Sequence, residues 1–157
     1  MSNPPDPSLD ILYLDNHLIA VRKPAGILTQ SDDSGGVSLM DQVKDWIKTE
    51  YKKPGKVFLG LVHRLDRPVS GIVVFARTSK GASRLSEQFR KKTTKKTYRA
   101  WVEGTPQPPQ ASLKHYLRKE KSLKATVFPR ATSKAKEALL DYEVVETLQN
   151  TSLLDIH

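Results

Sequence analysis

A charged turn that leads into an apolar segment constrains the fold of this chain more than any other feature. Residues 72–76, Ile-Val-Val-Phe-Ala, are too uniformly apolar and branched for a surface strand, so we expect a buried strand there. The turn before it, residues 63–71, reads His-Arg-Leu-Asp-Arg-Pro-Val-Ser-Gly. Because side chains alternate between two faces in an extended segment, Arg64 and Asp66 would lie on the same side. The guanidinium would then favour the charged form of the carboxyl group.

Spacing alone leaves two interpretations of Arg64 and Asp66 open. Pairs with this spacing commonly form a surface ion pair that closes a turn, and Asp66 beside Pro68 would fit that role. Charged clusters in clefts are also typical of catalytic sites. Spacing by itself therefore makes Asp66 a candidate catalytic residue and no more.

Apolar residues at helical spacing predict two helices. Ser38 is a suitable N-cap for the first helix, and Pro54 and Gly55 end it. The buried face of this helix is expected at Leu39, Val43, Trp46 and Ile47. The second helix is expected from Ser79 to about Lys92. Its buried residues are expected to be Ala82, Leu85 and Phe89.

Alternating and branched residues predict more strands than helices. The first two strands, residues 11–14 and 18–21, are joined by the turn-forming segment 15–17. Later strands are expected at residues 72–76, 98–102, 113–117, 125–128, 138–145 and 152–156. Because short turns connect several neighbours, we expect an α+β fold with a mostly antiparallel mixed sheet and flanking helices. Residues 1–8 are expected to be a disordered lead-in, and residues 9–157 to form one domain.

The chain carries a large excess of positive charge. Its 157 residues include 26 Lys and Arg against 17 Asp and Glu, so the formal net charge is +9. Such an excess indicates an anionic partner, and nucleic acid is the commonest partner of a basic domain. A solvated basic surface without a partner is the alternative.

The sequence lacks residues that several other kinds of site require. It contains no cysteine, which excludes disulfides and thiolate metal sites and fits a reducing compartment. Its four histidines have no i, i+4 pairing, so a zinc site is not expected. No apolar run approaches the roughly 20 residues of a membrane span, and the N-terminus has no signal-peptide pattern. We therefore expect a soluble, cytoplasmic protein with no metal and no membrane contact.

Three regions, in one order along the chain, resemble the motifs of the RluA-type RNA pseudouridine synthases. Residues 63–71 are similar to that family's signature, His-Arg-Leu-Asp-x-x-Thr-Ser-Gly, with Val69 in place of the usual Thr. Residues 11–13 and 17–26 resemble its first hairpin and its Lys-Pro-x-Gly turn. Residues 96–104, Lys-Thr-Tyr-Arg-Ala-Trp-Val-Glu-Gly, resemble its Lys-x-Tyr strand. The resemblance implies the catalytic fold of that family.

The resemblance implies a catalytic aspartate, Asp66, with Arg64, Tyr98 and His63 as substrate-binding residues. Arg64 would hold the flipped-out nucleotide or fill the space that it leaves. Tyr98 would pack on the uracil ring, unless it is only a core tyrosine at the end of a strand. His63 is expected to support the site structurally rather than to shuttle protons.

A carboxylate suits the isomerisation of uridine, in which the N-glycosidic bond breaks and the base rejoins the ribose through carbon. Asp66 would need no prior activation to attack a carbon atom or to take a proton. Covalent glycosyl-carboxylate chemistry also occurs in retaining glycosidases. Attack on the ribose C1′, addition to the uracil C6 and removal of the C2′ proton all remain open.

Six cations lie between residues 90 and 99. They are expected to bind RNA phosphates beside the site, although a solvated helix end is the plainer interpretation of each one. This group consists of Arg90, Lys91, Lys92, Lys95, Lys96 and Arg99. A second, sparser basic group has no assigned role and consists of Lys114, Arg118, Lys119, Lys121 and Lys124.

The chain ends at His157, inside an expected strand. The resembled family continues with a segment of the pattern Gly-Arg-x-His-Gln-Ile-Arg, whose Arg is expected to pair with the catalytic Asp. We therefore expect this chain to be truncated, without the C-terminal strands of the domain.

These patterns predict an enzyme that isomerises uridine to pseudouridine in ribosomal or transfer RNA. The resemblance implies that it needs no metal or organic cofactor, and we expect a monomer whose partner is RNA. A catalytically silent RNA-binding domain of the same fold is the main alternative. A hydrolase of nucleosides or glycosides that uses Asp66 is a weaker one.

Overall fold

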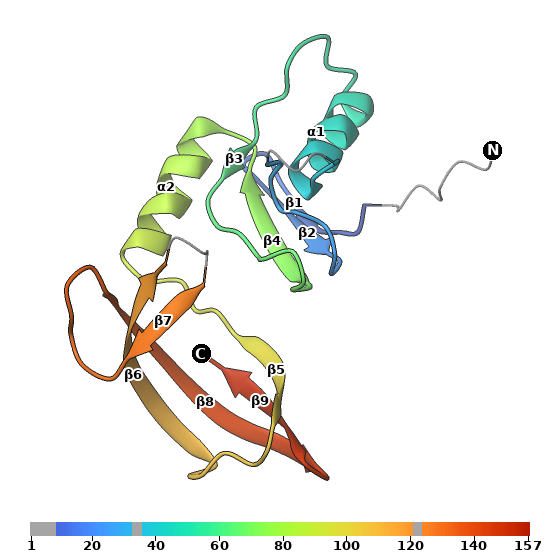
Figure 1. Ribbon diagram of the computed structural model, residues 1–157. Helices are drawn as coiled ribbons and strands as arrows, with labels where there is room; N and C mark the ends of the chain where they lie inside the picture. The colour runs from blue at the N-terminus through green and yellow to red at the C-terminus, as the bar shows by residue number, and fades with distance from the viewer. Residues whose placement is uncertain (1–8, 33–35, 121–123) are drawn as a thin grey trace. The chain divides into compact units, whose positions relative to one another are not determined.

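The computed structural model of the protein describes residues 9–32, 36–120 and 124–157. The expected lead-in, residues 1–8, lies outside this part of the chain. The chain forms two compact units, Met1–Thr94 and Lys95–His157, and each contains one sheet (Figure 1). Within the described residues, all neighbouring strands pair antiparallel and two helices accompany them, which confirms the α+β class. The strands that were expected in one sheet are thus divided between two.

The sheet of the first unit has four strands in the order β1-β2-β4-β3. Their bounds are Ile11–Leu14 for β1, Leu18–Lys23 for β2, Gly60–Leu61 for β3 and Gly71–Ala76 for β4. β1 and β2 form the expected hairpin. Its turn is closed by the carboxylate of Asp15, which accepts the backbone N–H groups of His17 and Leu18 at 2.7 and 2.6 Å.

β4 is a buried strand, as expected, because it lies between β2 and β3 in the sheet. Val73, Phe75 and Ala76 are 0% exposed. Ile72 differs, with 57% of its surface exposed, since it projects from the opposite face to Val73. The start of this strand therefore stands nearer to solvent than its uniformly apolar sequence predicts.

Helix α1, Leu39–Glu50, packs on the sheet of the first unit. It begins in a capping box, in which the Ser38 hydroxyl accepts the N–H of Asp41 and the Asp41 carboxylate accepts the N–H of Ser38. The expected buried face is confirmed at Leu39, Val43 and Ile47. These residues share one core with four residues of β2 and β4, namely Ile19, Val21, Val73 and Phe75.

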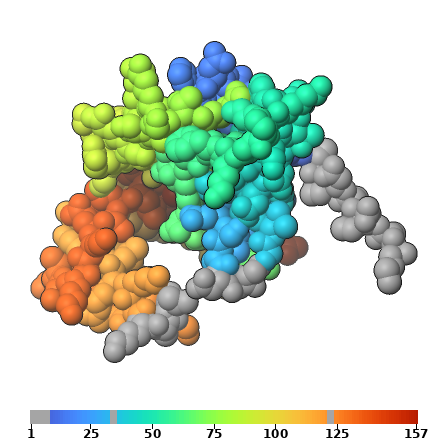
Figure 2. Space-filling model, turned by 90° about the horizontal axis from the view of Figure 1, so that it is seen from above, coloured from blue at the N-terminus to red at the C-terminus, as the bar shows by residue number. Residues whose placement is uncertain are grey.

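Helix α2, Ser79–Arg90, follows β4 and is capped by Thr78, whose hydroxyl accepts the N–H of Gly81 at 3.1 Å. Gly81 is the buried residue of this helix, whereas Ala82, Leu85 and Phe89 are only half-buried. The expected burial is incomplete because α2 packs mainly against the edge strand β3 and its neighbour β4, and both helices reach the surface of the first unit (Figure 2). No helix in the described ranges has the length and apolar composition needed to span a bilayer.

The second unit is a five-stranded sheet in the order β5-β9-β8-β6-β7. The bounds are Tyr98–Glu103 for β5, Gln110–Lys119 for β6, Ala125–Phe128 for β7, Lys136–Leu148 for β8 and Thr151–Ile156 for β9. Tyr142 and Leu154 are its buried apolar residues. Buried Ser152 donates its hydroxyl proton to the Gly104 carbonyl at 2.8 Å. Every strand expected in this part of the sequence is confirmed, and β6 and β8 are longer than expected.

Candidate active site

Asp66 lies in the loop that connects β3 to β4, residues 62–70, in the first unit. Leu65 packs against the core while Arg64 and Asp66 are exposed, so side chains alternate along the loop as expected. The expected pairing of Arg64 with Asp66 is not found. No ion pair joins either of them to a described residue, because both side chains extend into solvent.

Thr29, in the segment between β2 and α1, holds the residue that precedes Asp66. Its hydroxyl donates to the carbonyl oxygen of Leu65 at 2.8 Å and accepts the Leu65 N–H at 3.2 Å. Thr29 is only 2% exposed, so water competes poorly for these two bonds. No motif or spacing in the sequence predicted a role for this residue.

Gly26 holds the residue that follows Asp66. Its N–H donates to the carbonyl of Arg67 at 2.8 Å, and its carbonyl accepts a hydrogen bond from Arg67 Nε at 2.9 Å. Gly26 has a φ of 94°, a left-handed conformation that glycine adopts without strain. The Asp66 carbonyl accepts the N–H of Val69 at 3.0 Å, which closes a turn immediately afterwards.

Lys23 ends β2 and is fully buried, with 0% of its surface exposed. Its ammonium group donates to the backbone carbonyls of Pro24, Ile27 and Arg67 at 3.1, 2.8 and 3.2 Å. The three protons of the ammonium group thus have three acceptors, which offsets the cost of burying its charge. Burial lowers the pKa of Lys23, and the negative charge of Asp66 opposes that shift. Lys23 is thus a buried cation that feels the charge of Asp66 without forming an ion pair with it.

Lys23, Gly26 and Thr29 together form what we term the loop clamp. They lie close together in sequence. Their hydrogen-bond partners in the Asp66 loop are 36 to 44 residues away along the chain. Lys23 and Gly26 belong to the Lys-Pro-x-Gly turn, which the sequence identified as a family motif. The motif did not predict that this turn contacts the Asp66 loop.

His63 joins the start of the loop to β4 and α2. Its Nε2 accepts the backbone N–H of Val74 at 2.9 Å, so a neutral ring carries its proton on Nδ1. The ring stacks on Phe89, with 5.0 Å between ring centroids and 21° between ring planes. These contacts fit the supporting role expected of His63, and contact with a substrate stays a prediction.

Tyr98 begins β5, in the second unit, opposite Ile156 of β9. It is 41% exposed, so it is not the core tyrosine that the sequence left open as an alternative. Its ring is therefore free to meet a planar ligand, and stacking on uracil stays a prediction.

Two of the six cations expected to bind phosphate already have acidic partners. Arg99 forms a bidentate pair with Asp155, with Nε–Oδ1 and Nη2–Oδ2 distances of 2.7 and 3.1 Å. These hydrogen bonds raise the pKa of Arg99 and lower the pKa of Asp155. Lys91 pairs with Glu87 at 2.7 Å. The remaining cations are exposed and form no ion pair within the described chain, namely Arg90, Lys92, Lys95 and Lys96.

The chemistry available to this site depends on the exposed carboxylate of Asp66, which lies on an anchored loop. Because the backbone is held on both sides of Asp66, the carboxylate can be kept close to a reacting atom. Lys23 adds a fixed positive charge near it. Over the residues that the structure describes, no group of three or more His, Asp or Glu side chains is placed to hold a metal ion.

A family model matches almost the whole described chain. The family is described as RNA pseudouridylate synthase, and the match covers residues 17–157. The matched range includes most of the first unit, all of the second unit and every candidate site residue.

Curated relatives are named for the same activity. The tRNA pseudouridine synthase C of Haemophilus influenzae is 34% identical over 144 residues, which are 90% of this chain and 56% of the relative. The dual-specificity RNA pseudouridine synthase RluA of the same organism is 41% identical over 105 residues, 65% of this chain and 44% of the relative. The ribosomal large subunit pseudouridine synthase C of Rickettsia bellii is 28% identical over 144 residues, 92% of this chain and 46% of the relative. This chain thus spans about half the length of these relatives.

Two solved human structures share the fold. RNA Pseudouridylate Synthase Domain Containing 4 matches with a TM-score of 0.77 and 22% identity, over 94% of this chain and 57% of that chain. RNA Pseudouridylate Synthase Domain Containing 1 matches with a TM-score of 0.73 and 20% identity, over 99% of this chain and 62% of that chain. The family expected from the motif at residues 63–71 is confirmed. This chain belongs to the RNA pseudouridylate synthase family, as a member of its RluA type.

Proposed function

We propose that the protein isomerises uridine to pseudouridine in ribosomal or transfer RNA, with Asp66 as the catalytic residue. The observation that carries this proposal is the loop clamp, which anchors the backbone on both sides of an exposed Asp66. Family membership supports the reaction class. Relatives named for transfer RNA and for the large ribosomal subunit support the substrate class.

The reaction requires that the N1–C1′ bond of uridine break and that a C5–C1′ bond form. C5 loses a proton and N1 gains one, so substrate and product have the same atoms. Asp66 would act as a nucleophile at C1′ or C6, or as a base at C2′. A carboxylate needs no activating ion for any of these steps, so the proposal includes no metal and no organic cofactor.

Other residues have supporting roles in this proposal. Arg64 shares the exposed side of the loop with Asp66, which supports its role in holding the flipped nucleotide or filling the vacated space. Tyr98 would stack on uracil, a contact worth about 1–3 kcal/mol. We propose that residues 9–157 act together as the catalytic domain of a monomer. The absence of cysteine fits the cytoplasm as its location.

Release of tritium from RNA that carries 5-tritiated uridine tests the proposal, because C5 loses its hydrogen in the isomerisation. Unmodified transcripts of transfer RNA and of large-subunit ribosomal RNA serve as substrates for protein expressed from its complete reading frame. Asp66→Asn should reduce release on the order of 10³-fold or more. Asp45→Asn, which changes an exposed carboxylate on α1, is the matched control and should leave release unchanged. Equal release by the parent and Asp66→Asn would overturn the assignment of Asp66.

The same experiment separates the alternatives. RNA binding without tritium release, unaffected by Asp66→Asn, would indicate a catalytically silent RNA-binding domain. Free uracil among the products would indicate a hydrolase. The names of the relatives favour the synthase over both.

A further inference from the structure

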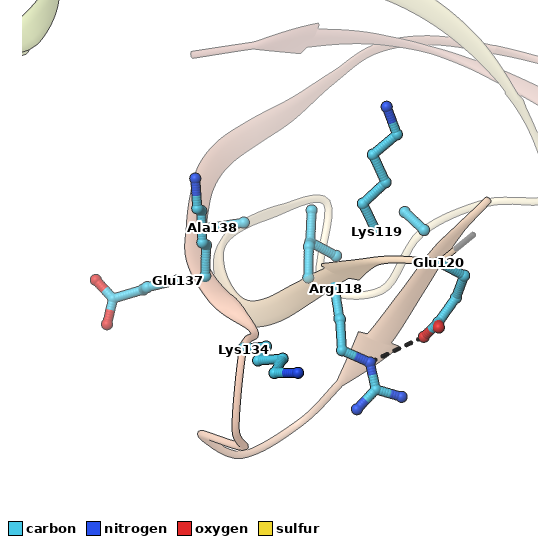
Figure 3. A pocket seen from close by; sticks show the side chains of 9 residues that line it. Arg118, Lys119, Glu120, Lys134, Glu137 and Ala138 are labelled. Atoms are coloured by element: carbon cyan, nitrogen blue, oxygen red, sulfur yellow. Dashed lines mark hydrogen bonds and ion pairs between the residues drawn. The ribbon is translucent and has the colours of Figure 1, made fainter. Parts of the chain in front are cut away.

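A hollow at one end of the second unit gathers cations that the proposed active site does not use. It has a volume of about 810 Å³ and lies where the end of β6 and the starts of β7 and β8 meet (Figure 3). Its charged lining residues are Arg118, Lys119, Lys134, Lys136, Glu120 and Glu137. Four cations and two acids therefore lie around one hollow.

The antiparallel register brings these cations together from separate parts of the sequence. Leu117 of β6 lies opposite Lys136 of β8. Lys119 is two residues beyond Leu117 on the same strand, so its side chain projects from the same face as Lys136. Lys134, with a φ of 65°, lies in the turn that leads into β8. Spacing along the sequence placed neither Lys134 nor Lys136 in a basic group.

Both acids of the hollow are already paired. Glu120 accepts a hydrogen bond from Arg118 Nε at 2.9 Å, drawn as a dashed line in Figure 3. Glu137 pairs with Lys114 at 2.7 Å, and its carboxylate points away from the other labelled side chains (Figure 3). Among the described residues, no acid forms an ion pair with Lys119, Lys134 or Lys136.

Arg118 is held in place by two contacts within the second unit. Besides pairing with Glu120, its guanidinium carbon lies 4.8 Å from the ring centroid of Phe128. The charge of Arg118 is thus already balanced by an acidic partner, Glu120. The three lysines are therefore the cations of this hollow that have no acidic partner among the described residues.

We infer that this hollow binds the phosphate backbone of the RNA substrate, through Lys119, Lys134 and Lys136, separately from the cations of residues 90–99. The inference rests on the proposed function. Lys119 and Lys136 project from the same sheet face, where their like charges repel each other, so an anion between them lowers the energy. Lys134 adds a third cation from the turn that precedes β8. Lysine binds phosphate as a mobile point charge. The successive phosphates of one RNA strand can engage all three lysines, and the hollow is larger than one phosphate group needs.

The dependence of RNA binding on salt concentration tests this inference. The test variant is Lys119→Gln/Lys134→Gln/Lys136→Gln. The control variant, Lys52→Gln/Lys53→Gln/Lys56→Gln, removes three exposed lysines that follow α1. The two sets are matched in net charge, and each includes one lysine at positive φ, 65° at Lys134 and 46° at Lys52. Binding is measured with a transfer RNA transcript and protein from the complete reading frame.

The test variant should reduce the slope of log affinity against log salt concentration by about two to three, because each lysine–phosphate contact contributes about 0.7–0.9. The control variant should keep the slope of the parent, and arginine at all three test positions should restore it. An unchanged slope in the test variant, or an equal reduction in the control, would overturn the inference. Tritium release by the parent and the variants is measured in parallel, with enough protein to saturate the RNA. The parent protein could release no tritium while its salt slope still exceeds that of the test variant. That result would refute the proposed activity and support RNA binding by the three lysines.

Discussion

The hydroxyl of Thr29 makes two hydrogen bonds to Leu65, donating to its carbonyl at 2.8 Å and accepting its N–H at 3.2 Å. Since Leu65 immediately precedes Asp66, Thr29 sets the backbone from which the carboxylate projects. Lys23 acts on the next residue, through the carbonyl of Arg67 at 3.2 Å. Both side chains are therefore positioning residues, which affect Asp66 through the loop.

Thr29→Val keeps the shape of the side chain and removes both hydrogen bonds. The Leu65 N–H and carbonyl would lose their partner where water competes poorly, so we expect a loss of about 1–3 kcal/mol in the free energy of unfolding. A displaced Asp66 should lower kcat of tritium release by about 10²-fold, with little change in KM. Thr29→Ser keeps the hydroxyl and should retain most activity, and exposed Thr49→Val is the control. A kcat equal to the parent's in Thr29→Val would contradict the positioning role.

Lys23→Met leaves the carbonyls of Pro24, Ile27 and Arg67 without their common donor. We expect the free energy of unfolding to fall by about 1–3 kcal/mol, measured by urea denaturation. Lys53→Met, at an exposed position, should cause little change. If the two variants unfold at the same urea concentration, the buried hydrogen bonds of Lys23 do not stabilise the loop.

Gly71→Ala should disturb the loop from its other end. Gly71 has a φ of 150°, and a Cβ there would lie 3.1 Å from Leu65 Cδ1, so the substitution strains the backbone and pushes on Leu65. We expect a loss of about 1–3 kcal/mol, seen as a lower Tm. Gly55→Ala, where an added Cβ meets nothing within 4 Å, should leave Tm unchanged or slightly raised. Equal Tm values for the two variants would rule out strain at Gly71.

Asp41 should contribute to the pH dependence of stability. Hydrogen bonds from Ser31 and Ser38 hold the pKa of Asp41 below its ordinary value of 3.8. The unfolded chain therefore takes up its proton first, so this stabilisation is complete above that value and is lost as pH falls through the folded-state pKa. Between about pH 6 and pH 2, Asp41→Asn should lose less stability than the parent in urea denaturation. Parallel pH profiles would show that Asp41 is not responsible.

Arg99→Gln should weaken RNA binding less than Lys96→Gln does. The charge of Arg99 is already engaged by Asp155 in a bidentate pair, whereas Lys96 is exposed and has no acidic partner within the described chain. Lys96→Gln should lower the salt slope of RNA binding by about 0.7–0.9 and Arg99→Gln by less. An equal reduction in both variants would mean that the Arg99–Asp155 pair opens when RNA binds.

Patterns between sequence neighbours were sufficient to predict most of the secondary structure. β1 and β7 have the predicted bounds, Ile11–Leu14 and Ala125–Phe128. α1 begins directly after its predicted cap, Ser38. These features depend on side-chain alternation, helical periodicity and capping, which involve residues only a few positions apart. The motif at residues 63–71 likewise predicted the family, because its residue types occur at fixed short spacings.

Contacts between distant segments could not be predicted in this way. β5 pairs with β9 rather than with β6, its neighbour in sequence, and the strands divide between two sheets. Alternation shows which face of a strand is apolar, but every strand with a similar face is a possible partner. For this reason the sequence predicted one sheet, whereas the structure contains two.

The sequence by itself determined the types of element, the excess of positive charge and the presence of Asp66 in a turn before a buried strand. Only the tertiary structure decided the hydrogen-bond or ion-pair partner of each charged side chain. It left Arg64 and Asp66 without an ion pair to any described residue, directed the buried ammonium of Lys23 to the carbonyl of Arg67, and paired Arg99 with Asp155. The physical reason is that electrostatic and hydrogen-bond partners depend on distances in space, which the path of the backbone sets across dozens of residues.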